Sequence, residues 1–284
     1  MAWYSLGPTI AASQPLEALR AAFAASDLVA LDLDHCIFPG YSQTALGERV
    51  AWRLLARPAR FLDRRFLPRL GLGGLCFALK EARRLLGRET SMERLMARYE
   101  RAMRGIPEPY VLDAAKAIPP ASYPLAEATI AELCRLAPTG IVTLGLDVVA
   151  RAYMEAFAGL SFYEANRVVF RTAARRDRVF GGYDRASLML DGGDKRRALE
   201  RRMGDLGATT PTTVGHSEDD VPLASLARER GGLGIGFNPP ASLRESFDVV
   251  VHGLDWEPMY ALVAILAAPR AARPPPGAGP AGKG

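Results

Sequence analysis

Residues 28–34 read LVALDLD, and this stretch decides the expected fold. Its apolar start is typical of a buried strand. Because side chains alternate along a strand, Asp32 and Asp34 are expected to point to the same side. In open α/β sheets ligands bind beyond the carboxyl ends of the strands, so a reacting group would be presented here. An isolated Asp-Xaa-Asp also has a simpler interpretation, in which one aspartate caps a helix and the other is solvated.

Short β-branched or apolar runs elsewhere in the chain alternate with helical patterns. The other predicted strands are at 140–145, 166–170, 212–216, 232–237 and 248–253, and the predicted helices are at 147–158, 194–206, 220–229 and 256–267. This alternation is typical of a mostly parallel sheet covered by helices. The predicted fold class is therefore α/β, with a Rossmann-like, doubly wound, mostly parallel sheet.

The segment between the first two predicted strands has a different character. Residues 41–137 carry almost no strand signal, and their apolar residues recur at helical spacing. Pro39 and Gly40 mark the entry, and Pro138 to Gly140 mark the return to the sheet. We predict an α/β core domain over 1–40 and 138–268, with a helical cap domain over 41–137. The last segment, 269–284, is rich in Pro, Gly and Ala and is predicted to be a disordered tail.

Composition limits the classes of function. The formal net charge is +5, but the basic residues are spread along the chain without interleaved aromatic residues, which argues against nucleic-acid binding and fits an anionic substrate. Cys36, Cys76 and Cys134 lie far apart, which disfavours both a disulfide framework and a zinc site. No secretory signal and no membrane span are predicted. We expect a cytoplasmic protein, and its oligomeric state is left open.

Three further segments carry polar residues at the positions where one crevice would need them. Thr143 ends the GIVT strand, Lys195 opens the helix DKRRALERRM, and Asp219 and Asp220 follow the strand TTV. Taken alone, Thr143 could bond to the backbone, Lys195 could be solvated, and the Asp pair could cap a helix. The informative observation is that these residues occur along the chain in the order that one catalytic crevice would require.

These segments resemble the four motifs of the haloacid dehalogenase-like (HAD) hydrolase superfamily. The matching stretches are DLDHC (32–36), the strand that ends at Thr143, Lys195, and GHSEDD (215–220). EANRVVF (164–170) and GLGIGFNP (232–239) are similar to the phosphoserine phosphatase-like branch. The insertion directly after the first motif matches the C1-type helical cap of the family. The resemblance covers about two thirds of the chain.

The resemblance implies a Mg²⁺-dependent phosphatase, a phosphomonoester hydrolase acting on a small phosphorylated metabolite. In this scheme Asp32 attacks phosphorus and forms an aspartyl-phosphate, while Asp34 protonates the leaving oxygen and later activates water. The residues expected to bind the phosphoryl group are Asp32, Thr143, Leu144, Gly145 and Lys195. The metal ligands expected are a carboxylate oxygen of Asp32, the backbone carbonyl of Asp34, and Asp219 or Asp220. Clustered carboxylates need compensating cations, which a divalent metal and Lys195 supply.

Two residues depart from the family pattern. Cys36 stands where Thr or Val is usual, and His216 stands where an Asp commonly holds the metal. Because imidazole is a poorer ligand for a hard cation, we expect weaker Mg²⁺ binding with Mn²⁺ or Co²⁺ as alternatives. His216 could instead only bond a neighbour. The segment PGYSQ (39–43) has no acidic residue to recognise an amine, so phosphoserine is not the expected substrate. The alternative function is a catalytically weakened protein of this fold that binds a phosphorylated ligand or a protein partner.

Overall fold

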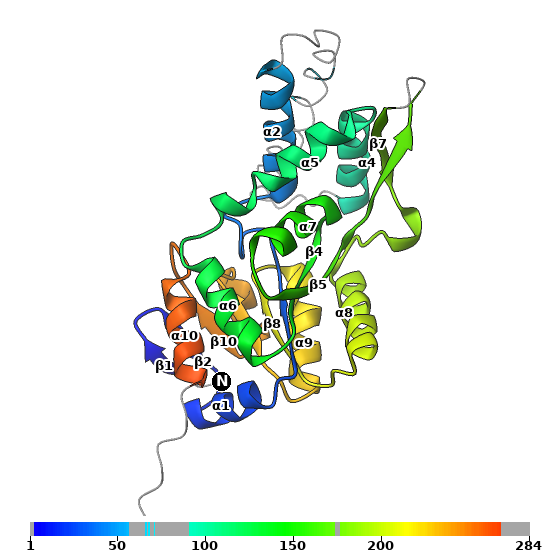
Figure 1. Cartoon of the computed structure of the whole chain (residues 1–284). Helices are drawn as coiled ribbons and strands as arrows, with labels where there is room; N and C mark the ends of the chain where they lie inside the picture. Colours follow the sequence, from blue (N-terminus) through cyan, green and yellow to red (C-terminus); the bar gives the residue numbers. More distant parts are fainter. Residues whose placement is uncertain are drawn as a thin grey trace, which may run out of the picture.

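The central feature of the fold is an eight-stranded sheet (Figure 1). We describe it from a computed structural model that covers residues 3–56, 66, 68, 71, 91–173 and 177–267. The strand order is β1-β2-β10-β9-β8-β3-β4-β5. The strands are β1 (Tyr4–Gly7), β2 (Ile10–Ala12), β3 (Leu28–Leu31), β4 (Thr139–Leu146), β5 (Leu160–Asn166), β8 (Pro211–Gly215), β9 (Gly234–Phe237) and β10 (Val249–Val251). The strands from β10 to β5 are all parallel, and the β1–β2 hairpin adds antiparallel to β10.

Helices cover both faces of this sheet, and β3 explains why. Val29 and Leu31 belong to one large apolar cluster, whereas Leu28 and Ala30 belong to a second cluster. Side chains alternate between the faces of a strand, so a strand buried at every position needs a helical layer on each side. The helices are α1 (Leu16–Ala24), α6 (Ala126–Leu136), α7 (Asp147–Ala156), α8 (Gly192–Leu206), α9 (Val221–Glu229) and α10 (Glu257–Ala267). Contacts group α10 with α1 and α6, and α8 with α9. The predicted doubly wound α/β class is confirmed.

The strand order places the first motif at a switch point of the sheet. β3 pairs with β8 on one side and with β4 on the other, and Leu31 lies opposite Val214 and Ile141. The connections from these neighbouring strands run in opposite directions across the sheet, which opens a crevice beyond their carboxyl ends. Residues that follow β3, β4 and β8 therefore meet at one edge.

A second group of elements lies above this edge (Figure 1). It contains α2 (Ser42–Ala56), α4 (Met92–Met103) and α5 (Glu108–Lys116). The antiparallel hairpin β6 (Val168–Thr172) and β7 (Arg178–Tyr183) packs against α4 and α5. Gly105 and Ile106 bond the backbone of Phe180, which attaches the hairpin to the chain after α4. By contrast α6, which falls within 41–137, packs against α10 and strands β4 and β5.

One predicted strand has the wrong position in the fold. The sequence predicts a strand of the parallel sheet at 166–170, but this run contributes β6 of the separate hairpin, and the sheet strand is β5 just before it. The chain leaves the sheet after Asn166, where the Val168 amide donates to Asp147 Oδ1 at 2.9 Å and redirects the backbone. The valines of β6 therefore pair with β7 instead of β4.

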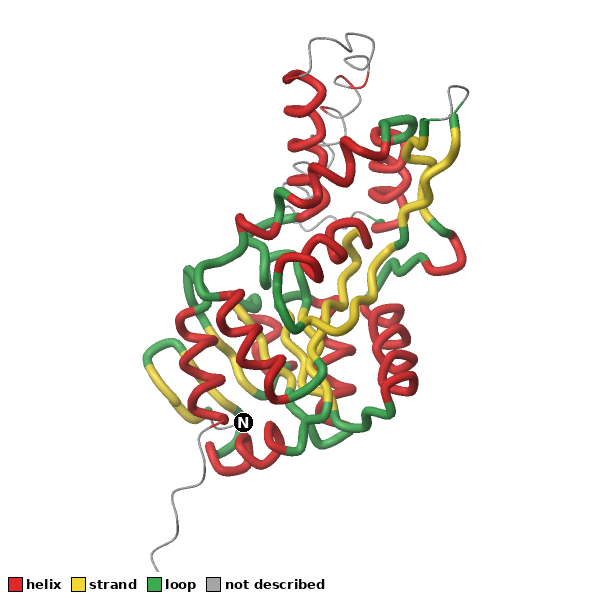
Figure 2. The backbone as a smooth tube through the Cα atoms, viewed as in Figure 1, coloured by secondary structure: helices red, strands yellow, loops and turns green. Residues whose placement is uncertain are grey.

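The other predicted strands and helices are present with shifted ends. Figure 2 shows how helices and strands are distributed over the described residues. The sequence did not predict α1, β1, β2, β5 or β7. Cys36 and Cys134 are free thiols. Cys76 and the predicted tail 269–284 lie outside the described residues. No helix in the described part of the chain has the length and apolar character needed to cross a bilayer.

Candidate active site

Asp32 and Asp34 stand at the carboxyl end of β3, as the sequence predicted. The Asp32 amide donates to Val214 O at 2.8 Å and extends the ladder toward β8, and its side chain is buried. The chain then turns sharply, with His35 in the left-handed region at φ 55°. Asp34 Oδ1 accepts a hydrogen bond of 2.8 Å from the amide of Ser42, the first residue of α2. The first helix above the sheet is therefore attached directly to the second aspartate.

Lys195 connects the first and last motifs. It lies in the first turn of α8, whose start is capped by Asp191 through a 2.8 Å bond to the amide of Asp194. The Lys195 side chain is buried, and its Nζ donates to Asp32 Oδ1 at 2.8 Å and to Asp220 Oδ1. Burial alone would lower the pKa of Lys195, but the two carboxylates outweigh it and raise the pKa. A permanent cation therefore lies between two buried anions.

Asp220 organises the loop that follows β8. Its Oδ2 accepts bonds from the His216 amide at 2.8 Å and from the amide and hydroxyl of Ser217, both at 3.0 Å. Gly215 is required because a Cβ there would overlap the Asp220 side chain. Together with Lys195 on Oδ1, these donors fix the orientation of the carboxylate, and Oδ1 keeps an acceptor position for a further ligand. Asp220 therefore positions Lys195 and the loop. Asp219 is the neighbouring residue, and its backbone carbonyl lies against Gly192 at the start of α8.

His216 lies directly on the nucleophile candidate. Its Nδ1 is 3.1 Å from Asp32 Oδ2 and 3.5 Å from Asp220 Oδ2. Ligand atoms of these three residues lie within 4.8 Å of one another, so this cluster could hold a metal ion. Two carboxylates with one imidazole fit a divalent cation that accepts mixed oxygen and nitrogen ligands. Asp32 and Asp220 were predicted metal residues, whereas His216 joins in place of the Asp219 carboxylate.

The carboxyl groups of Asp32 and Asp34 have pKa values shifted in opposite directions. Burial raises the pKa of Asp32, but the charge of Lys195 and the bond with His216 outweigh it and lower that pKa to about 2. For Asp34, burial and the nearby charge of Asp32 raise the pKa to about 6. One carboxylate is therefore held ionised, while its neighbour can carry a proton near neutral pH. Such a division is typical of acid/base sites.

The predicted phosphate-binding segment 143–145 forms the other wall. Thr143 is buried near the end of β4, and its Oγ1 accepts a hydrogen bond from the Gly145 amide at 3.0 Å. Leu144 O accepts from Gln43 Nε2 at 3.2 Å and from Asn166 Nδ2 at 2.8 Å. The segment is thereby fixed between α2 and β5.

Ser42 is a site residue that the sequence analysis missed. A Cβ on Gly145 would lie 3.3 Å from Ser42 Oγ and 3.1 Å from Thr143 Oγ1, so the two hydroxyls flank Gly145. Ser42 is fully buried, and its hydroxyl lies near enough to the Asp34 carboxylate to oppose the rise in the pKa of Asp34. A buried hydroxyl beside the Asp34 carboxylate can donate to a bound oxyanion. Its only sequence signal is its place at the start of a helix after Pro39-Gly40.

A parallel sheet with two aspartates at its switch point, a buried lysine from a later helix and helices above the edge places the chain in the class of doubly wound α/β folds. No protein-family model and no curated protein sequence matches the chain. Solved structures do. A HAD-family hydrolase from Salmonella enterica subsp. enterica serovar Typhi superposes with a TM-score of 0.60 at 16% identity, over 87% of this chain and 73% of that chain. A phosphoserine phosphatase carrying a phospho-aspartyl intermediate analogue gives 0.59 at 18%, over 84% and 98%.

A cytosolic 5'-nucleotidase IIIB bound to cytidine gives a TM-score of 0.58 at 13% identity, over 92% of this chain and 94% of that chain. These structures confirm the resemblance at the level of the fold. The chain has the HAD hydrolase fold, in the form seen in phosphoserine phosphatases.

Proposed function

We propose that this chain is a metal-dependent phosphomonoester hydrolase that acts on a small phosphorylated metabolite. The observation that carries the proposal is the geometry around Asp32. One of its oxygens is bonded to Lys195 and the other faces His216, while Asp34 is held beside it by the Ser42 amide. A nucleophile fixed in its ionised form next to a protonatable carboxylate is the arrangement that two-step phosphoryl transfer requires.

In the first step an oxygen of Asp32 forms a bond to phosphorus while the bond from phosphorus to the ester oxygen breaks. Asp34 gives its proton to that departing oxygen, so an alcohol leaves. In the second step Asp34, now a carboxylate, takes a proton from water as the water oxygen attacks phosphorus. The bond between phosphorus and Asp32 breaks, and inorganic phosphate and ionised Asp32 are released.

The other residues stabilise charge on the transferring oxygens. Lys195 is preorganised by Asp220, and the hydroxyls of Ser42 and Thr143 flank Gly145. Donors fixed in a buried site need no reorganisation when the charge develops. A divalent cation held by Asp32 and His216, with the Asp34 carbonyl, would supply Lewis-acid stabilisation of those oxygens.

The mixed ligand set bears on which cation is used. Mg²⁺ prefers oxygen ligands, whereas imidazole suits later divalent metals. We therefore propose activity with Mn²⁺ or Co²⁺ that exceeds activity with Mg²⁺. The test is hydrolysis of para-nitrophenyl phosphate and a panel of phosphorylated metabolites with each metal in parallel. Turnover that disappears in Asp32→Asn supports the enzyme.

The alternative function is a binding protein that has lost turnover, and His216 is the observation that favours it. If His216 occupies the metal position without binding a cation, the crevice would hold a phosphorylated ligand or partner but not hydrolyse it. Inactivity with every metal, combined with saturable binding of a phosphorylated compound, would establish this function. The two free thiols support the proposal that either function operates in the reducing cytoplasm.

A further inference from the structure

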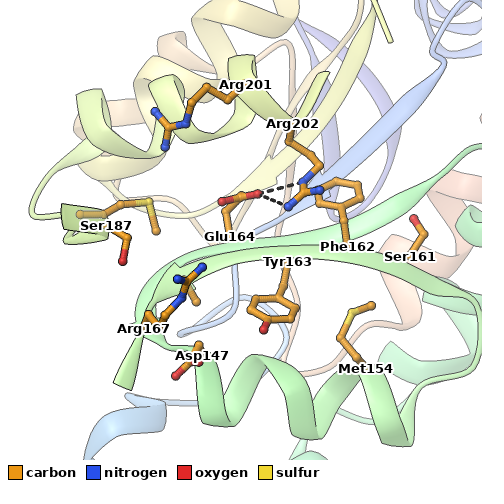
Figure 3. Close-up of a pocket in the computed structure, with 12 residues that line it drawn as sticks. Asp147, Met154, Ser161, Phe162, Tyr163, Glu164, Arg167, Ser187, Arg201 and Arg202 are labelled. Atoms are coloured by element: carbon orange, nitrogen blue, oxygen red, sulfur yellow. Dashed lines mark hydrogen bonds and ion pairs between the residues drawn. The ribbon is translucent and has the colours of Figure 1, made fainter. Parts of the chain in front are cut away.

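A second concave site lies at the outer edge of the central sheet. β5 is the last strand in the order of the sheet, with β4 on its inner side. Beside it, α7 and α8 enclose a pocket of about 330 Å³, lined along β5 by residues 161–165 (Figure 3). Small-molecule sites typically measure about 300–1,000 Å³. β4 separates this pocket from the strand that carries Asp32, so it is distinct from the proposed catalytic centre.

The acidic residues of the pocket are already neutralised. Arg202 Nε donates to Glu164 Oε1 at 2.8 Å, and its guanidinium lies 5.9 Å from the centre of the Phe162 ring. The dashed lines in Figure 3 mark the Arg202–Glu164 pair. Asp147 pairs with Arg151, which donates from Nη2 to Oδ2 at 3.0 Å. Neither carboxylate therefore leaves an uncompensated negative charge to repel an anion.

Two other arginines of the pocket lack such close compensation. Arg167 Nη1 lies 3.6 Å from Asp184 Oδ2, beyond hydrogen-bond distance, and the Arg167 side chain is 67% exposed. Arg201 makes no ion pair with any residue in the described part of the chain. The pocket therefore carries an excess of positive charge, and guanidinium groups bind carboxylate and phosphate oxygens in pairs.

The backbone around Arg167 is held in place without a ligand. On one side, the side chain of Asn166 accepts from the Met189 amide at 2.6 Å and donates to the Met189 carbonyl at 3.0 Å. On the other side, the Val168 amide is bonded to Asp147. Since both neighbours of Arg167 are fixed, the wall of the pocket is preformed, which lowers the cost of ordering it on binding.

We propose that this pocket binds a small molecule in which a carboxylate or phosphate group is attached to an apolar or aromatic part. Arg167 and Arg201 contact the anionic group. Tyr163 and Met154, which line the side toward α7 in Figure 3, contact the apolar part. The pocket uses none of the proposed catalytic residues, so its occupancy does not depend on the proposed phosphatase activity.

Isothermal titration of the full chain with phthalate and with phenylphosphonate tests the proposal. These probes join a ring to a carboxylate pair and to a phosphonate, and the one that binds identifies the preferred anion. We expect a dissociation constant in the millimolar range or below, weakened at least about tenfold in the double variant Arg167→Ala/Arg201→Ala. Arg230→Ala, which removes an exposed arginine at the end of α9, serves as the control and is expected to stay within about twofold of the parent chain.

Two results would overturn the proposal. One is the absence of saturable binding of both probes at about 10 mM, a concentration that detects millimolar affinity. The other is equal binding by the parent chain and the double variant, which would place the bound probe elsewhere. A circular dichroism spectrum of the double variant confirms that it is folded. Because phthalate contains no phosphorus, its binding is independent of whether the chain hydrolyses phosphate esters.

Discussion

Two aspartates, two positions apart, have pKa values shifted in opposite directions by their surroundings. Asp32 is bonded to Lys195 and His216, so its ionised form is favoured despite burial. Asp34 forms no ion pair with the described residues, and burial together with the charge of Asp32 raises its pKa, so its protonated form persists to a higher pH. The proposed assignment of nucleophile and acid/base rests on these neighbours rather than on the carboxylates themselves.

Asp34→Asn is expected to bind substrate and metal but to turn over about 10²–10⁴-fold more slowly, because amide cannot exchange the proton. The pH dependence has a definite sign. A group with its pKa raised to about 6 is protonated below that pH, so phosphorylation by the parent chain should decline as the pH rises through about 6. Rates of burst-phase alcohol release against pH measure this step. A variant rate near that of the parent would exclude Asp34 as the acid.

The replacement of a carboxylate by His216 can be tested by restoring the carboxylate. In His216→Asp, Mg²⁺ affinity should rise at least about tenfold relative to the parent chain, because a hard cation gains an anionic oxygen ligand. Calorimetric titration with Mg²⁺ and Mn²⁺ gives the ratio of the two affinities. His216→Asn, a neutral side chain of similar size, is the control and should not improve Mg²⁺ binding. Unchanged metal affinities in His216→Asp would show that this residue is not a ligand.

At the scale of elements, close approach of β4 and β5 depends on Gly140. A Cβ at this position would overlap the backbone carbonyl and ring of Phe162. We expect Gly140→Ala to lower the free energy of unfolding by about 1–3 kcal/mol, because the strands must separate. Gly204→Ala is the matched control. This helical residue of α8 has open space around it, so alanine should stabilise the chain by about 0.5–1 kcal/mol. Urea unfolding measures both, and equal effects of the two substitutions would contradict the prediction.

The elements also explain how far the sequence could predict the fold. The core strands β3, β9 and β10 are short apolar runs and β8 is a short run rich in β-branched residues, all buried at every position, and such runs are recognisable without a structure. β5 reads LSFYEAN, and its mixture of polar and apolar residues hides a sheet-edge strand. The valine-rich run after it has the stronger strand signal but pairs in the hairpin, because Asp147 fixes the turn between them. Tertiary contacts, rather than local strand propensity, therefore determine which of these two runs joins the central sheet.

The order of motifs along the chain predicted which residues would meet, but it did not give the details of their contacts. Asp32, Lys195 and Asp220 come together as the order of the strands required. Ser42 could not be found, because a serine at the start of a helix is ordinary until the fold buries its hydroxyl beside Asp34. The pairing of His216 with Asp32 likewise depends on the path of the loop after β8.

At the scale of the whole molecule, the last helix supports the first motif. Trp256, which precedes α10, is fully buried and donates from Nε1 to the carbonyl of Cys36 at 2.7 Å. Cys36 lies in the turn between Asp34 and α2, so a residue 220 positions away holds the backbone beside the proposed acid/base.

Trp256→Phe should therefore affect both stability and catalysis. Loss of the indole N–H leaves a buried carbonyl without this donor, which is expected to cost about 1–3 kcal/mol of unfolding free energy. Because the turn after Asp34 is then less well positioned, kcat should fall while KM changes little.

Phe237→Leu removes volume beside the same indole but no hydrogen bond, so it should lower stability and retain kcat. Trp52→Phe, at a side chain that is 71% exposed, should change stability by less than about 0.5 kcal/mol. If kcat falls equally in Trp256→Phe and Phe237→Leu, the effect comes from packing, and the hydrogen bond to Cys36 has no specific role in positioning Asp34.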